Sequence, residues 1–297
     1  MIWLPIVGNY CEIDAYASIL AYADLLNQRH KPAKTYIPFT PNYSVPTELR
    51  IKDLENTHFD MRPDDQAIIL DVSVPEAINR LVPDNQILEL IDHHPGYEEY
   101  WHERIGSRAI IEPIGAVATS IFEWWGECWD YEKMPPAIAK LLLAAILDNT
   151  LNFNANITTD RDRNAAKSLT AIAKMPLDVF TKWYFSKVSD TITGHLTDSL
   201  LNDCKTVQNL HFAQLTLWNA TKILQNPTII SAAMNSHHTN WIASIISISE
   251  RKNYFIASSN KTIQPFIELL DLKLKNSIYQ SHGIYLRKEI IAKILAH

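Results

Sequence analysis

The segment Ile87-Leu88-Glu89-Leu90-Ile91-Asp92-His93-His94-Pro95 places one carboxylate and two imidazoles directly after an apolar run. A short apolar run of this kind is consistent with a fully buried strand of a parallel sheet. Ligands of open α/β sheets bind outside the carboxyl ends of the strands, and Asp with His suits a divalent transition ion. The segment therefore predicts a metal site at the point where this strand ends.

Two other apolar runs, near residues 2–7 and 67–70, also end in polar side chains. Asp148 lies near the end of a helical segment that is too apolar to tolerate an unpaired charge. Two divalent ions about 3.5–4 Å apart could share one carboxylate and turn a bridging water into a hydroxide nucleophile. Phosphorus is the expected electrophile, because basic side chains are also available. The polar side chains that follow the three runs, together with the helical aspartate, are Asn9, Glu12, Asp14, Asp71, Asp92, His93, His94 and Asp148.

The composition limits the class of protein. The chain has 297 residues, 47% of them hydrophobic, which is enough for a substantial core and fits two domains better than one. Its net charge of −6 argues against a general nucleic-acid or membrane-surface binder. Cys11, Cys128 and Cys204 are too few and too scattered for a disulfide framework, and we interpret them as small buried hydrophobes. No run of about 18 apolar residues and no basic leader occurs, so we expect a cytoplasmic protein.

In the first half of the chain, short apolar runs alternate with helix-period segments, as expected of a parallel sheet with helices on both faces. Pro135-Pro136 opens a further helix that runs to Asn149. Thr159-Asp160 is typical of a cap for a helix that ends near Met175. The apolar runs lie near 2–8, 35–39, 67–71, 87–91 and 108–112, and the first helical segments lie near 14–29, 75–82 and 115–127.

A polar stretch from Ser189 to Gly194 is the best candidate for a linker. Beyond it, helices and strands are mixed, which indicates a smaller α+β domain. We therefore predict an α/β protein with an N-terminal parallel-sheet domain at 1–188 and an α+β domain at 195–297. In the second domain we expect helices near 195–205, 226–235 and 262–272 and after 283–286, with strands near 212–218, 241–249 and 253–257.

Other features allow a functional or a structural interpretation. Arg287-Lys288 open the last helix, where a guanidinium, an ammonium and helix N–H groups could meet a phosphate. Lys205 is a further cation, although charged side chains of this kind are often simply solvated. The tryptophan-rich segment 124–129 indicates core packing or a homodimer contact, and His237-His238 is interpreted as a surface loop.

These segments resemble the DHH phosphoesterases, in the branch that carries a DHHA2-type C-terminal domain. That branch comprises the manganese-dependent family II inorganic pyrophosphatases, the exopolyphosphatases and the prune-like enzymes. The resemblance covers nearly the whole chain, and its segments occur in the order found in the family. It rests on Gly8-Asn9 with Glu12 and Asp14, on Asp71, Asp92-His93-His94, Gly115-Ala116-Val117-Ala118-Thr119, Ala145-Ile146-Leu147-Asp148, Thr159-Asp160 and Leu286-Arg287-Lys288.

The resemblance implies an active site in the cleft between the two domains, with Asp71 bridging two divalent metal ions. Manganese is the expected metal, and magnesium or cobalt are alternatives. By the same resemblance, one ion is held by Asn9, Glu12 and Asp71, the other by Asp14, Asp71, His93 and Asp148, catalysis involves Asp71, Asp92 and His94, and the phosphate substrate is bound by His94, Lys205, Arg287 and Lys288.

The chain also departs from the pyrophosphatases. Asn9 stands where they carry His, and in this respect Gly8-Asn9 is similar to the exopolyphosphatase and prune-like members. We therefore expect hydrolysis of polyphosphate or short polyphosphates, with pyrophosphate as the second substrate. Two alternatives stay open: cleavage of a phosphodiester in a small nucleotide, and a phosphate- or nucleotide-binding module whose catalysis has decayed at Asn9 and Glu12.

Overall fold

The computed structural model describes all residues except 9, 203, 277 and 296–297. The chain divides into two compact units, Met1–Thr181 and Lys182–His297. The polar stretch 189–194 that was predicted to be a linker is helical, because it forms the last turns of α7 (Leu177–Gly194). That prediction was wrong because buried apolar residues such as Val188 and Ile192 keep the helical period through the polar stretch.

The first unit contains a five-stranded parallel sheet in the order β2-β1-β3-β4-β5. Its strands are short and mostly apolar, which is the pattern that the sequence predicts. They are β1 (Ile2–Pro5), β2 (Ala33–Tyr36), β3 (Gln66–Leu70), β4 (Ile87–Asp92) and β5 (Ala109–Ile111).

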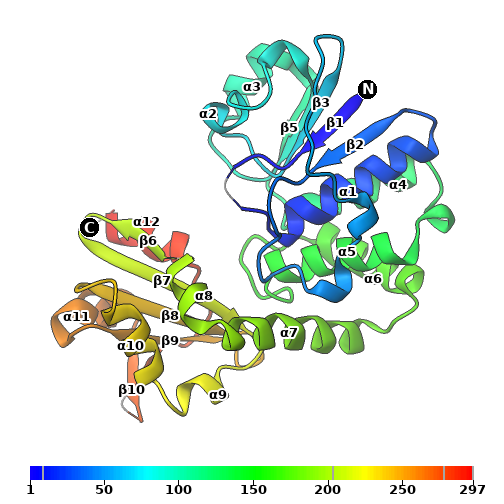
Figure 1. The fold of residues 1–297 in the computed structure, drawn as a ribbon. Coiled ribbons are helices and arrows are strands. Elements are labelled where there is room, and N and C mark those ends of the chain that lie inside the picture. The colour runs from blue at the N-terminus through cyan, green and yellow to red at the C-terminus, as the bar shows by residue number, and fades with distance from the viewer. Residues whose placement is uncertain (9, 203, 277, 296–297) are drawn as a thin grey trace. The chain divides into compact units, whose positions relative to one another are not determined.

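Helices cover both faces of this sheet (Figure 1). One face carries the two helices that follow β3 and β4, namely α2 (Pro75–Ile78) and α3 (Glu98–Ile105). The other face carries α1 (Ile13–Gln28), α4 (Val117–Cys128), α5 (Pro136–Asn149) and α6 (Asp160–Ala173). Short 3-10 turns lie at Thr47–Leu49, Lys52–Leu54, Asp84–Gln86, Gly106–Arg108 and Tyr131–Lys133.

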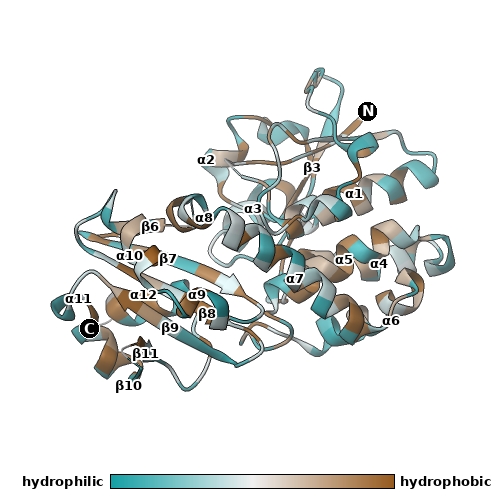
Figure 2. Ribbon diagram, turned by 60° about the horizontal axis from the view of Figure 1, so that its bottom comes forward, coloured by the Kyte–Doolittle hydropathy of each residue, from teal (hydrophilic) through white to brown (hydrophobic). Residues whose placement is uncertain are grey.

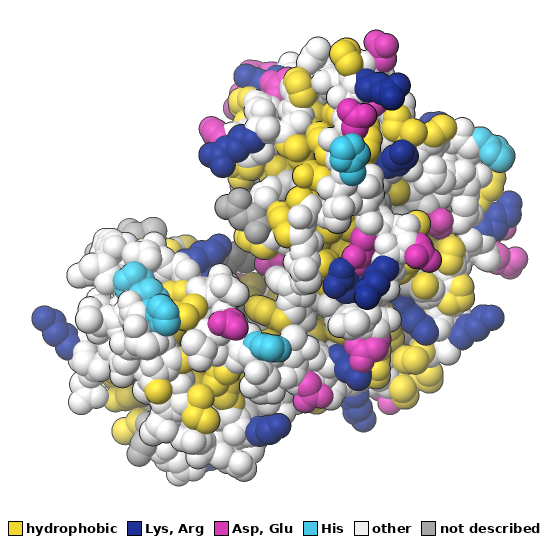
Figure 3. Space-filling view, viewed as in Figure 1, with side chains coloured by type: hydrophobic (Ala, Val, Ile, Leu, Met, Phe, Trp, Pro, Cys, Tyr) yellow, Lys and Arg dark blue, Asp and Glu magenta, His cyan; other side chains and the backbone are white. Residues whose placement is uncertain are grey.

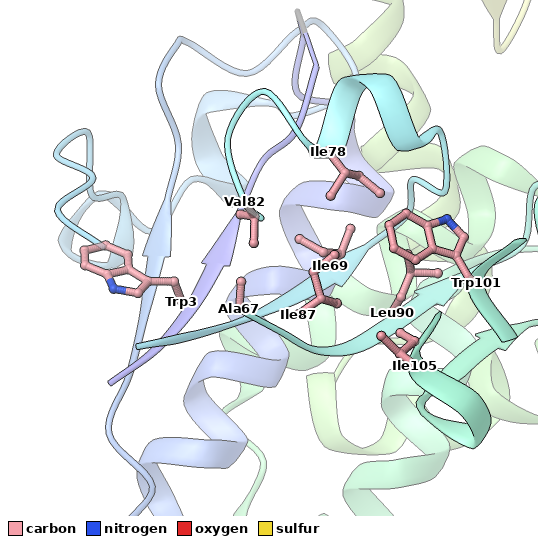
Figure 4. Packing of buried hydrophobic residues seen from close by; sticks show 9 residues of the cluster. All are labelled: Trp3, Ala67, Ile69, Ile78, Val82, Ile87, Leu90, Trp101 and Ile105. Carbon is pink, nitrogen blue, oxygen red and sulfur yellow. The ribbon is translucent and has the colours of Figure 1, made fainter. Parts of the chain in front are cut away.

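The core between the sheet and α2 and α3 fixes how β3 and β4 are held (Figure 4). Ile69 of β3 and Leu90 of β4 are fully buried there, next to Trp101 of α3, whose indole N–H donates to the Ser73 carbonyl oxygen over 2.7 Å. Burying an Ile or Leu side chain contributes about 1.5–3 kcal/mol to the stability of the fold. The close-packed core therefore holds the ends of β3 and β4, which carry Asp71 and Asp92, in place.

Helix α5 is buried nearly all round, as its sequence predicts. Residues Leu141 to Leu147 are fully buried, and Figure 2 colours this helix largely toward the apolar end of the scale. It packs against α1, α4 and α6. Its carboxyl-terminal end, with Asp148 and Asn149, consequently reaches the same layer as the amino-terminal end of α1.

The second unit contains a six-stranded mixed sheet in the order β10-β11-β9-β8-β7-β6, in which only β7 and β8 pair in parallel among the described strands. The strands are β6 (Cys204–Val207), β7 (Leu210–Leu217), β8 (Trp241–Ser247), β9 (Lys252–Ala257), β10 (Lys273–Lys275) and β11 (Ile278–Gln280). The helices are α8 (Leu196–Asn202), α9 (Thr221–Leu224), α10 (Thr228–Asn235), α11 (Asn260–Leu269) and α12 (Arg287–Leu295).

The predicted α/β fold class is confirmed, with differences at polar elements. Helix α3 and strands β6, β10 and β11 were not predicted, because they are short and lack a long apolar period. The helix expected at 195–205 ends at Asn202. Among the described helices, none is long and apolar enough to span a bilayer. Acidic and basic side chains are interspersed on the face shown in Figure 3.

Candidate metal centre

Four potential metal-binding side chains come together at the carboxyl ends of β3 and β4. Leu70 of β3 pairs with Ile91 of β4, so the residues that follow, Asp71 and Asp92, lie at the same edge of the sheet. One ligand atom from each of Asp71, Asp92, His93 and His94 lies within 4.8 Å of the other three. The structure thus gathers two carboxylates and two imidazoles where the sequence predicts a metal site.

The backbone at Asp71 has an unusual conformation. Its φ is +62°, in the left-handed region that few residues other than glycine adopt, although Asp and Asn tolerate it best. The Asp71 N–H still donates to the Ile91 carbonyl oxygen over 2.9 Å, so β3 stays paired with β4 up to this residue. The chain therefore turns sharply at Asp71 while its carboxylate stays in the cluster.

The tautomer of His93 follows from its hydrogen bond. Nδ1 lies 3.0 Å from the Ile114 carbonyl oxygen, which can only accept, so Nδ1 carries the proton. Nε2 then presents a lone pair, and it faces Asp71 Oδ1 over 3.5 Å. Two electron-pair donors that face each other at this distance need a cation or a proton between them. A backbone carbonyl that fixes the second nitrogen is the usual support of a metal-binding histidine.

Asp92 holds the backbone of His93 and the imidazole of His94. Its Oδ1 accepts from the His93 backbone N–H over 2.7 Å and lies 2.8 Å from His94 Nδ1. Burial acts to raise the pKa of Asp92, but the hydrogen bond from His94, the charge of His94 and further hydrogen bonds together outweigh it, and the pKa lies below its ordinary value. The side chain of His94 is 56% exposed, so this histidine is held by Asp92 at one nitrogen and reaches the surface with the rest of the ring.

The cluster carries more negative charge than its surroundings accommodate. Burial raises the pKa of Asp71 well above its ordinary value, and the neighbouring carboxylates of Asp14, Asp92 and Glu12 raise it further. Among the described residues, Asp71 Oδ1 and Asp92 Oδ2 are buried without a hydrogen-bond partner. A bound divalent cation would offset the negative charge and bind the two unpaired carboxylate oxygens. A mixed carboxylate and imidazole ligand set suits Mn2+. The residues present therefore fit a transition-metal ion.

Asp14 lies next to this cluster and also holds the start of α4. Its two carboxylate oxygens accept from the backbone N–H groups of Val117 and Ala118, each over 2.9 Å. Asn149, at the end of α5, donates to the same carboxylate over 2.6 Å. A carboxylate at a helix N-terminus is favoured by the helix dipole. The Gly115–Thr119 segment thus positions Asp14.

Asp162 was not predicted, although it supports this arrangement. It forms a capping box with Thr159 at the start of α6, and its buried carboxylate also accepts from the Gly115 N–H over 3.1 Å and the Thr119 hydroxyl over 2.6 Å. A Cβ on Gly115 would lie 2.6 Å from Asp162 Oδ2, so only glycine fits there. Thr159 with an acidic residue at the third helical position is the sequence signal that could have found it.

The remaining predicted ligands lie at the ends of neighbouring helices. Glu12 is the N-cap residue of α1, and its charge reaches Asp71. Asp148 is half-buried near the end of α5. In the described part of the chain, Glu12, Asp14 and Asp148 are not members of the four-residue group. Asn9 lies outside the described residues.

Apart from His94, the predicted substrate-binding residues lie in the second unit. Lys205 is exposed on β6. Arg287 is only 8% exposed: its guanidinium donates to the Phe212 carbonyl oxygen over 3.2 Å, and its backbone N–H donates to Gln214 Oε1 over 2.6 Å. The side chain of Lys288 lies outside the described residues. Arg287 is thus anchored on β7, whereas Lys205 is held by its strand alone.

Comparison with known proteins finds relatives that are similar over most of the chain. No family model matches the sequence. The chain is 25% identical over 299 residues to a protein of Shouchella clausii named as a manganese-dependent inorganic pyrophosphatase, covering 94% of this chain and 92% of the relative. A protein of Lactobacillus helveticus with the same name is 22% identical, with the same coverage. The chain is thus similar, over nearly its whole length, to proteins named as manganese-dependent inorganic pyrophosphatases.

Two solved structures share the fold. A Methanococcus jannaschii protein assigned to the family II inorganic pyrophosphatases has a TM-score of 0.63 and 18% identity, and covers 99% of this chain. An exopolyphosphatase-related protein of Bacteroides fragilis has a TM-score of 0.52 and 13% identity. The predicted family resemblance and the fold class are confirmed by these matches. The predictions of a hydrolase and of manganese agree with the names of the sequence relatives.

Proposed function

We propose that this protein is a manganese-dependent phosphohydrolase that cleaves phosphoanhydride bonds of inorganic polyphosphate or short polyphosphates. The proposal rests on two buried electron-pair donors that face each other at the ends of β3 and β4: Asp71 Oδ1 and His93 Nε2, which lie 3.5 Å apart. A folded protein keeps two such donors together when a cation joins them. The relatives named as manganese-dependent pyrophosphatases support both the metal and the phosphorus chemistry.

Asp71 would be the shared ligand of two ions. Asp14, His93 and Asp148 would complete the ligands of one ion, and Asn9 and Glu12 those of the other. When bound, the pair of ions would supply a hydroxide nucleophile at neutral pH and offset charge that develops on the phosphate. Asp92 would hold the ring of His94 in one orientation by hydrogen bonding, while the Ile114 carbonyl oxygen holds the ring of His93.

His94 is the group of this cluster best placed to meet a substrate. Asp92 binds its Nδ1, and more than half of the side chain is exposed. A histidine held in this way can donate a hydrogen bond or a proton to a phosphate oxygen or to the leaving group. We therefore assign His94 to substrate binding and to stabilising the leaving phosphate.

The basic residues of the second unit would bind the rest of the anionic substrate. Arg287 is held in place by its bonds to β7, so its planar guanidinium is already ordered before a phosphate binds. Lys205 is exposed, and Lys288 follows Arg287 at the start of α12. Together they would recognise charge along the phosphate chain.

The choice between polyphosphate and pyrophosphate depends on the first metal-binding segment. Asn9 replaces the histidine of the pyrophosphatases, which favours polyphosphate, whereas the names of the relatives favour pyrophosphate. Pyrophosphate is therefore our second candidate. We also propose a cytoplasmic location and a homodimer; Trp125 itself is fully buried in α4, so a dimer contact would involve the half-buried Trp124 and Trp129.

Phosphate release by the manganese-loaded protein tests the proposal. The substrates are pyrophosphate, tripolyphosphate, long-chain polyphosphate and a dinucleotide diester, each assayed with the native chain and with Asp71→Asn. We expect the fastest release from tripolyphosphate or longer chains, and its loss in the variant.

Other outcomes would change the assignment. Faster release from pyrophosphate would make the protein a pyrophosphatase in which Asn9 replaces the usual histidine. Cleavage of the diester alone would move it to nucleotide turnover. Two bound manganese ions without release from any substrate would identify a decayed binding module.

A further inference from the structure

A second cluster of metal-binding side chains lies in the second unit and shares no residue with the ligands assigned above. One ligand atom from each of Cys204, His211 and His238 lies within 4.8 Å of the other two, and all three residues are half-buried. Figure 3 shows histidine side chains grouped at the surface of this unit. The sequence alone does not predict this cluster, because a strand turn and two helices separate its members in the chain.

The sheet brings the three residues together. Cys204 starts β6, which pairs antiparallel with β7, so that Thr206 lies opposite His211 and Cys204 opposite Ala213. Residues two apart on a strand share a face, and so Cys204 and His211 project from the same face. His238 comes from the turn between α10 and β8, and β8 pairs with β7 at His211. Three separate segments therefore converge.

Neighbouring contacts place the imidazoles. The rings of His211 and His238 stack at a centroid distance of 3.9 Å, with 18° between their planes. Thr206 Oγ1 lies 3.1 Å from His211 Nδ1, which is the kind of bond that selects a histidine tautomer. Binding of one ion by both histidines would require one ring to tilt out of the stack, a rotation that half-buried side chains make readily.

We propose that Cys204, His211 and His238 bind a zinc ion. A thiolate and two imidazoles form a borderline-soft ligand set that suits zinc, whereas the carboxylate-rich cluster of the first unit suits manganese. Three protein ligands leave a fourth position open, which water or an anion can take. Cys204 is half-buried and Cys128 is exposed, so the prediction of a buried hydrophobe is confirmed for Cys11 and wrong for these two cysteines. His237-His238 lie in the turn between α10 and β8 with His237 exposed, in agreement with the predicted surface loop.

The site would lie beside a residue of the proposed substrate machinery, since Cys204 directly precedes Lys205 on β6. Zinc bound to Cys204 would fix the start of this strand and thereby restrict the backbone of Lys205. The zinc site itself does not depend on the proposed phosphohydrolase activity, because none of its three ligands is assigned to that activity.

Cobalt titration tests the proposal, because Co2+ replaces zinc and gives a thiolate charge-transfer absorption that oxygen and nitrogen ligands do not give. The full chain carrying Asp71→Asn is stripped of metal and titrated with Co2+, followed by displacement with Zn2+. We expect one equivalent of thiolate-bound cobalt per chain, with affinity at least about 100-fold weaker after Cys204→Ser or His238→Ala, since the loss of a direct ligand exceeds the loss of an outer one.

Two matched variants serve as controls. Cys128→Ser removes an exposed cysteine that is not in the cluster, and His237→Ala removes the adjacent histidine. Both should keep the cobalt absorption and the displacement by zinc. Thermal unfolding of each metal-free variant shows whether it is folded, and zinc should raise the unfolding midpoint only in chains that keep all three ligands.

A missing charge-transfer band in the folded chain would overturn the proposal. A band that persists in Cys204→Ser would also overturn it, because the thiolate would then be another cysteine. If the native chain released no phosphate while this band was present, the result would count against the proposed function alone.

Discussion

The two candidate metal sites are built in different ways. At the ends of β3 and β4, consecutive residues of two parallel strands supply oxygen and nitrogen ligands that are largely buried and fixed by hydrogen bonds. Near β6 and β7, single residues from three segments supply sulfur and nitrogen ligands that are half-buried and loosely held. The first site is preorganised for catalysis, whereas the second is suited to an ion that itself orders its ligands.

The largest expected effect is that of removing the shared ligand. Asp71→Asn keeps a side chain that tolerates the left-handed backbone at φ +62° but lowers the charge of the cluster. Phosphate release should fall by more than about 100-fold, the upper range for loss of an outer-shell partner. Manganese content should fall with it, while zinc binding near Cys204 stays unchanged.

The same variant also separates metal binding from folding. Without metal, Asp71 is crowded by the charges of Asp14, Asp92 and Glu12. The metal-free variant should therefore unfold at the same temperature as the metal-free native chain, or at a higher one. A lower midpoint in differential scanning calorimetry would show that Asp71 stabilises the fold itself.

The next largest effect concerns the support of the first site. Asp162→Ala would leave the Gly115 N–H and the Thr119 hydroxyl without their acceptor in a buried position. We expect a loss of about 3 kcal/mol in the free energy of unfolding, measured by urea denaturation. The control is Asp160→Ala, at an exposed position in the first turn of the same helix, and it should cost less than about 1 kcal/mol. Equal losses would show that Asp162 acts only as part of the cap.

A smaller effect is expected at His94, because it is held by Asp92 and exposed. His94→Gln should lower kcat by about 10- to 100-fold, at or below the usual range for a lost acid–base or polar contact. Manganese content should not change. If manganese content and kcat fell in parallel, His94 would be a metal ligand instead of a substrate-binding residue.

The smallest effect is expected at the surface of the first unit. Arg161 binds Glu112 over 2.7 Å and Glu123 over 2.6 Å, and its side chain is 43% exposed. The hydrogen bond from Arg161 holds the pKa of Glu112 below its ordinary value of 4.5, so the stabilisation is present above that pH and is lost as the pH falls through the folded-state pKa. Arg161→Gln should therefore cost less than about 1 kcal/mol at neutral pH, and urea denaturation should show a smaller difference in acid.

The sequence predicts the first site better than the second for a physical reason. In a parallel sheet, the strand ends meet at one edge, so Asp71 and Asp92-His93-His94 could be placed together from two apolar runs. The role of Asp162 was not predicted, because its partners Gly115 and Thr119 are distant in the chain. The second cluster was not predicted, because the convergence of Cys204, His211 and His238 depends on the register of a mixed sheet, which no short sequence pattern specifies.

Anomalous X-ray diffraction from crystals of the manganese-loaded native chain tests the central claim most directly. The account predicts two manganese peaks about 3.5–4 Å apart, with a carboxylate oxygen of Asp71 bound to both. A single peak, or peaks that do not contact Asp71, would contradict the two-metal assignment.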